Sequence, residues 1–182
     1  MKPNFNPTNF RTLSAAFSLV ELLIAVAVAS IVFAAVGSLS LFTTRSLVAM
    51  GNYNDLDRAS RNALDTMSRE IRQTRQLTGY AVNKLTFQNL DGSALVFEFN
   101  PGDGTLVCKK GTASTTLLTQ CDLLTFHISQ RNPSNNFSFY PVSGTNYATA
   151  KLIDVNWRCS RNILGNKANT ESVQTAKIVV RN

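Results

Sequence analysis

Few residues in this chain have the type and spacing that catalysis or metal binding requires. There are three cysteines, Cys108, Cys121 and Cys159, and one histidine, His127. The cysteines form no C-x-x-C pair, and one histidine cannot complete a plausible zinc set. Glycine-rich phosphate loops, a G-x-S-x-G elbow and an H-E-x-x-H helix are also missing from the sequence. We therefore expect no enzyme activity, no metal and no cofactor.

The cysteines have a second use if the part of the chain that carries them is exported. One disulfide with one thiol left over is then the simplest arrangement. Cys108 and Cys121 are the closest pair in sequence, and a disulfide between them would stabilise the fold by about 3 kcal/mol in the chain-entropy model. The two pairings with Cys159 stay open. Three reduced thiols in a packed domain are the alternative.

The remaining candidate is a carboxylate, Glu21, at the edge of an uncharged run over residues 22–44. A membrane-spanning helix needs about 20 residues, so this run is long enough to cross a bilayer. A carboxylate within the hydrocarbon costs roughly 2.5–3.5 kcal/mol on insertion scales and is normally paired or functional. Near a helix N-terminus it is also stabilised by the helix dipole. Glu21 is therefore a candidate functional residue, and a glutamate resting among lipid head groups is the alternative.

The residues around Glu21 form an ordered motif. The sequence Ala16-Phe-Ser-Leu-Val-Glu21-Leu-Leu23 resembles the cleavage and methylation motif of type IV prepilins and type II secretion pseudopilins. The resemblance implies that a prepilin peptidase cuts between Ala16 and Phe17 and methylates the new amine of Phe17. It also implies that Glu21, as fifth residue of the mature chain, meets the amine of a neighbouring subunit during filament assembly. Ala16 stands where this family usually has glycine.

The resemblance also implies where the protein works and with what. A minor pilin or pseudopilin of a type IV pilus or a type II secretion pseudopilus would be a single-pass inner-membrane protein with its C-terminal domain in the periplasm. Its partners would be the prepilin peptidase, other pilin subunits and the inner membrane, and assembly would place it in the filament. Two alternatives stay open: a DNA-uptake pilin and a plain signal-anchored periplasmic protein.

The helix is expected to continue past the uncharged run. Apolar and small residues recur at spacings of three and four, which predicts an amphipathic stripe. Charges of alternating sign, four residues apart, predict a solvated opposite face. Residues 58–73 resemble the corresponding helix of J-type pseudopilins and W-type minor pilins. We expect one helix from about Phe17 to Leu77, ended by Gly79. The stripe comprises Tyr53, Leu56, Ser60, Ala63, Leu64, Met67, Ile71 and Leu77.

After Gly79 the hydrophobic period changes from 3.6 to 2, which predicts strands. Residues 84–88 and 95–99 should form a hairpin through Asp91-Gly92. We expect about six strands in one antiparallel sheet, with the amphipathic part of the helix on one face, an α+β fold that the pilin resemblance also implies. The expected strands are 84–88, 95–99, 105–108, 117–118, 123–128, 148–157 and 176–180, with polar loops at 129–146 and 160–174. The expected parts are a cleaved leader (1–16), a transmembrane and assembly helix (17–44), its amphipathic continuation (45–78) and a β-rich periplasmic domain (79–182).

The chain is basic, with 18 Lys and Arg against 11 Asp and Glu, a formal charge of +7. This balance suits nucleic acid or anionic lipid. Because the basic residues are scattered along the chain, the composition selects neither partner. Nucleic acid is therefore a possible partner without specific support.

Overall fold

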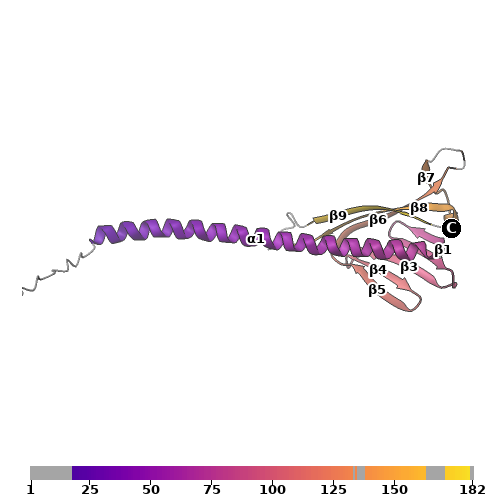
Figure 1. Cartoon of the computed structure of the whole chain (residues 1–182), viewed down its shortest axis with the longest axis horizontal. Coiled ribbons are helices and arrows are strands. Elements are labelled where there is room, and N and C mark those ends of the chain that lie inside the picture. The colour runs from indigo at the N-terminus through magenta and orange to yellow at the C-terminus, as the bar shows by residue number, and fades with distance from the viewer. Residues whose placement is uncertain (1–17, 133, 135–137, 163–170, 181–182) are drawn as a thin grey trace, which may run out of the picture. The chain divides into compact units, whose positions relative to one another are not determined.

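A computed structural model describes residues 18–132, 134, 138–162 and 171–180 of the chain. It divides into two compact units, Met1–Thr44 and Arg45–Asn182. A single helix, α1 (Leu19–Arg72), begins in the first unit and ends in the second. All described strands belong to the second unit, where the last part of α1 lies against them (Figure 1). The α+β class predicted from the sequence is confirmed.

The part of α1 in the second unit is amphipathic, as the sequence predicts. Its buried residues are Leu56, Ser60, Ala63, Met67 and Ile71, at spacings of three and four. These spacings keep all five side chains on one helix face. Beside this face the Arg61 guanidinium contacts Asp57 one turn earlier, at 2.8 Å. Tyr53 departs from the predicted stripe, because 49% of its surface is exposed.

The predicted end of the helix at Leu77 is wrong. The helix ends at Arg72, and Thr74–Ala81 forms strand β1. The Thr74 hydroxyl donates to the Ile71 carbonyl at 2.7 Å and so satisfies one carbonyl of the last turn. Register irregularities in β1 leave Thr74 and Leu77 buried three residues apart. Leu77, the last residue of the predicted stripe, is buried in this strand and not on the helix.

The strands form two antiparallel sheets, so the prediction of one sheet with about six strands is also wrong. One sheet has the order β1-β2-β3-β4-β5, a meander, and the other has the order β7-β6-β8-β9. A short 3₁₀ helix, η1 (Tyr147–Thr149), precedes β8. The other strands are β2 (Lys84–Asn89), β3 (Ala94–Asn100), β4 (Thr105–Lys110), β5 (Ala113–Leu118), β6 (Cys121–Arg131), β7 (Phe139–Pro141), β8 (Ala150–Ser160) and β9 (Glu171–Val179).

The local strand predictions hold better than the sheet count. The β2–β3 hairpin is confirmed, and Asp91 supports its turn by accepting hydrogen bonds from the backbone and hydroxyl of Ser93. Strand β7 lies inside the predicted loop 129–146, and β9 begins inside the predicted loop 160–174. Parts of both loops fall outside the described residues. Each predicted strand from residue 84 onward overlaps an observed one.

The two sheets and the helix share one hydrophobic core. Its largest fully buried side chains come from all three: Met67 and Ile71 from α1, Phe87 and Phe97 from the first sheet, and Phe126 and Trp157 from the second. Hydrogen bonds also connect the two sheets. The Tyr80 hydroxyl donates to the Phe126 carbonyl at 2.9 Å, and the Phe126 amide donates to the Val82 carbonyl at 2.8 Å.

Candidate functional site

The first turn of α1 contains the candidate residue Glu21. The Glu21 amide donates to the Ser18 hydroxyl at 3.2 Å, and the Leu22 amide donates to the Ser18 carbonyl at 3.1 Å. Ser18 is therefore the N-cap of the helix, and Glu21 is its third residue. A serine followed by glutamate three positions later is the capping-box pattern, a signal that the sequence analysis did not use.

This arrangement places the acid where the helix dipole is most positive. The Glu21 side chain is exposed in the single chain, within the first turn of a helix whose leading amides carry partial positive charge. A cationic group from another molecule can therefore reach it. The predicted cleavage residues Ala16 and Phe17 lie outside the described residues.

The surface that follows Glu21 is apolar and uncovered. Every residue from 18 to 48 is exposed, including Leu22, Ile31, Phe33 and Phe42. By length and composition α1 could cross a membrane. The described residues bury none of its most apolar segment. A surface of this kind requires lipid or other apolar helices to cover it.

Four hydroxyl side chains within this apolar segment make their hydrogen bonds inside the helix. The hydroxyls of Ser30, Ser38, Thr43 and Thr44 donate to carbonyls three or four residues earlier, at 2.8–3.0 Å. Such bonds remove the penalty of an unsatisfied hydroxyl in hydrocarbon. The segment is therefore compatible with a bilayer despite its serines and threonines.

Comparison with known proteins identifies this same region. Residues 11–37 match the family described as the prokaryotic N-terminal methylation motif. The match supports a type IV pilin-like protein. Such a protein is processed by a prepilin peptidase and assembles with other pilins. Ala16, Phe17 and Glu21 all lie within the matched residues, and the long apolar helix that follows is consistent with a membrane-anchored pilin. No curated protein matches the chain.

The three cysteines occupy both sheets. Cys121 on β6 lies opposite Cys159 on β8, whereas Cys108 lies on β4 of the other sheet. All three are buried and carry free thiols in this structure. The strand neighbours of Cys108 are Phe97 and Thr115. The cross-strand partner of Cys121 is thus Cys159, and not the Cys108 that sequence proximity suggested.

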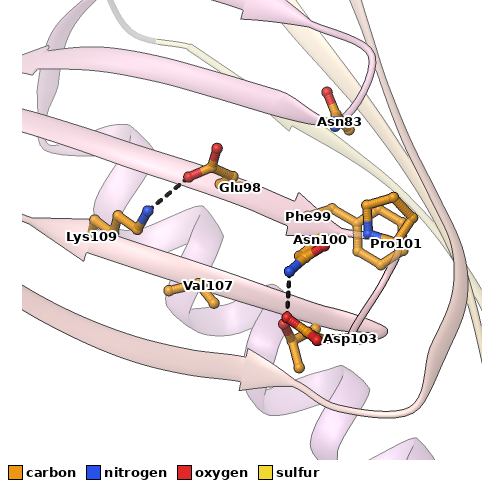
Figure 2. Close-up of a pocket in the computed structure, with 9 residues that line it drawn as sticks. Asn83, Glu98, Phe99, Asn100, Pro101, Asp103, Val107 and Lys109 are labelled. Carbon is orange, nitrogen blue, oxygen red and sulfur yellow. Dashed lines mark hydrogen bonds and ion pairs between the residues drawn. The ribbon is translucent and has the colours of Figure 1, made fainter.

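A shallow pocket lies over β3 and β4, and Figure 2 shows Lys109 in contact with Glu98 and Asn100 in contact with Asp103. Lys109 and Lys84 contact the Glu98 carboxylate at 2.8 and 3.2 Å. These hydrogen bonds, that of Lys109 foremost, lower the pKa of Glu98. The Asn100 amide donates to Asp103 within the following turn. The polar groups of this pocket are therefore used by the fold itself.

The histidine and two turn aspartates have structural surroundings. His127 is exposed on β6, opposite Asp154 on β8. Asp91 and Asp103 both accept hydrogen bonds within their own turns. Within the described ranges, no three His, Cys, Asp or Glu residues come together in a group that could hold a metal ion.

Proposed function

We propose that this protein is a minor pilin or pseudopilin, a structural subunit of a type IV pilus or type II secretion pseudopilus. A prepilin peptidase cuts between Ala16 and Phe17 and methylates the Phe17 amine. The mature helix then enters a filament in which the Glu21 carboxylate pairs with the N-terminal amine of a neighbouring subunit. The protein itself is a structural component and carries out no catalysis.

The observation that carries this proposal is the combination at the start of α1. The matched methylation motif contains an acid in the first helical turn, and the apolar surface of this helix segment is exposed among the described residues. Apolar helices in a membrane associate by close packing, and a paired carboxylate adds register. An ordinary membrane anchor would need the apolar surface but not the acid.

The second unit is proposed to lie in the periplasm, with the chain crossing the inner membrane once. The proposed parts are the leader 1–16, the assembly helix 17–44, and the amphipathic helix and β-rich domain that follow Arg45. The resemblance of residues 58–73 favours a J-type pseudopilin or a W-type minor pilin. In the described structure these residues pack on both sheets, which supports a role as the stem of the folded domain.

A substitution of Glu21 tests the assembly role. Glu21→Ala should leave the full chain in the inner membrane but remove it from sheared filaments, in cells that make the cognate pilins. The matched control is Asp65→Ala, which removes an exposed acid from the same helix outside the apolar segment. The control should be incorporated like the wild type. Wild-type incorporation of Glu21→Ala would refute the assembly role and favour a plain signal anchor.

DNA uptake has weaker support. Several basic side chains contact acids of the same domain, among them Lys110 with Glu70 at 2.7 Å and Arg161 with Asp55 at 3.1 Å. Intramolecular pairs of this kind reduce the positive potential that nucleic acid requires. A gel-shift titration of the detergent-solubilised chain should therefore detect no salt-sensitive DNA binding. Binding that weakens steeply with salt would restore the DNA-uptake alternative.

A further inference from the structure

Cys121 and Cys159 face each other across the β6–β8 ladder. They are register partners in an antiparallel pair. The Ser160 amide donates to the Gln120 carbonyl at 3.0 Å, whereas the Cys121 amide donates to Gly104 at 2.9 Å, away from Cys159. A hydrogen bond between the residues just beyond a pair, with an amide of the pair directed elsewhere, is the pattern of a non-hydrogen-bonded pair.

This kind of pair has the spacing that a disulfide requires. Cα atoms in non-hydrogen-bonded antiparallel pairs are about 4.5 Å apart, and their side chains lie on the same face of the sheet. Disulfides have Cα separations of about 4.4–6.8 Å. The backbone therefore already holds the two sulfurs within bonding reach, without any rearrangement of the strands.

The surroundings of the two thiols also suit a structural disulfide. Both residues are almost fully buried, at 3% and 1% exposure. The hydrogen bond from the Cys159 thiol lowers the pKa of Cys121 and raises that of Cys159. The two thiols therefore lie in hydrogen-bonding contact in the folded chain. Burial raises the pKa of Cys108, whose strand neighbours carry no sulfur, so Cys108 is the unreactive thiol.

We propose that Cys121 and Cys159 form an intramolecular disulfide and that Cys108 remains a thiol. The inference rests on the proposed export of the second unit in one respect, because export supplies the oxidising compartment. The pairing itself rests on the strand register. Unlike the pairing suggested by sequence proximity, it joins the two central strands of one sheet.

The oxidant is the disulfide of an exported thiol oxidoreductase or of a small molecule. The Cys121 thiolate attacks one sulfur of that disulfide, forms a mixed disulfide and expels the other sulfur as a thiolate. The deprotonated Cys159 then attacks the Cys121 sulfur and displaces the second thiolate of the oxidant. Two thiols of the chain lose two electrons and two protons, and the oxidant disulfide gains them as two thiols. Because both cysteines are buried once folded, this exchange accompanies the closing of the sheet.

The disulfide would secure the point where the helix meets both sheets. The Cys121 amide bond to Gly104 joins β6 to the start of β4. Next to Cys159, Ser160 donates to Asp122, and Arg161 contacts Asp55 of α1 at 3.1 Å. A covalent link here holds β6 and β8 together at the end of the domain that contacts the middle of α1.

Peptide mapping tests the pairing directly, since trypsin separates the three cysteines. Cleavage after Lys and Arg puts Cys108 in peptide 85–109, Cys121 in 111–131 and Cys159 in 159–161. The full chain in detergent is refolded in a glutathione redox buffer, alkylated and digested without reductant. We expect peptide 111–131 linked to 159–161, with Cys108 alkylated. A link that involves Cys108, or alkylation of all three cysteines, would overturn the proposal.

Alanine variants provide matched controls, because alanine is small enough for all three buried sites. Reductant should lower the denaturation midpoint of Cys108→Ala, as it does for the wild type. It should leave the midpoints of Cys121→Ala and Cys159→Ala unchanged. A shift that disappears in Cys108→Ala would contradict the pairing. Because oxidation takes place in vitro, a failure of export or assembly leaves this result unchanged. Conversely, absence of the link leaves the pilin assignment intact.

Discussion

The indole nitrogen of Trp157 donates a hydrogen bond to the hydroxyl of Ser60 at 3.2 Å, and both residues are almost fully buried. Ser60 lies within the apolar stripe of α1, and Trp157 lies on β8. A polar residue is tolerated in this stripe because its partner is the one indole of the chain. The bond connects the helix that we propose for assembly with the sheet that carries the proposed disulfide.

Removal of this hydroxyl should destabilise the second unit. Ser60→Ala leaves the indole N–H buried without a partner, at a cost of about 1–3 kcal/mol. Denaturation of the detergent-solubilised chain, followed by circular dichroism, measures this loss. In a double-mutant cycle with Trp157→Phe, the serine substitution should cost much less, since the N–H is already gone. Equal losses in both backgrounds would show that the bond contributes nothing.

Two glycines have similar backbone angles but different surroundings. Alanine substitutions at these two sites can therefore separate the stability cost of close packing from that of backbone conformation. Gly104 and Gly111 have φ values of 61° and 58°, so alanine at either site costs about 1–2 kcal/mol through conformation alone. An added Cβ at Gly104 would also lie 3.1 Å from the Cys121 carbonyl oxygen, whereas at Gly111 it would meet nothing within 4 Å. Gly104→Ala should therefore lower the denaturation midpoint more than Gly111→Ala. The opposite order would contradict the described contact between β4 and β6.

The Glu98 ion pairs predict a modest loss of stability in acid. Hydrogen bonds from Lys109 and Lys84 hold the pKa of Glu98 below its ordinary value of 4.5. The resulting stabilisation is present above pH 4.5 and disappears as the pH falls through the lowered pKa. Glu98→Gln should flatten the acid limb of a stability–pH curve, and Lys109→Met should flatten it in part because Lys84 remains. Superimposable curves for all three proteins would refute the prediction.

The sequence predicts local features of this fold well, because they depend on local physics. The stripe through Leu56, Ala63 and Met67 follows from helical spacing alone, and the β2–β3 hairpin follows from Asp91-Gly92. The uncharged run after Glu21 likewise identifies a segment that the rest of the chain leaves exposed.

Features that depend on tertiary contacts are not visible in the sequence. Leu77, the last residue of the predicted stripe, is buried in β1, and the separation into two sheets depends on which strands pair after Cys121. Cys108 is closer to Cys121 in sequence, but the antiparallel pairing of β6 with β8 puts Cys159 opposite Cys121. The Ser18 cap was readable as a capping box, so that omission was avoidable.

In the proposed assembly, the mature chain begins at Phe17 and uses Glu21 as its fifth residue. Mass spectrometry of the N-terminal peptide, taken from the membrane fraction of cells that contain a prepilin peptidase, tests it most directly. We predict a peptide that starts at Phe17 and carries one methyl group on its amine, and an uncleaved bond between Ala16 and Phe17 in cells without the peptidase. An intact leader in the presence of the peptidase, or a mature terminus at another residue, would contradict the account.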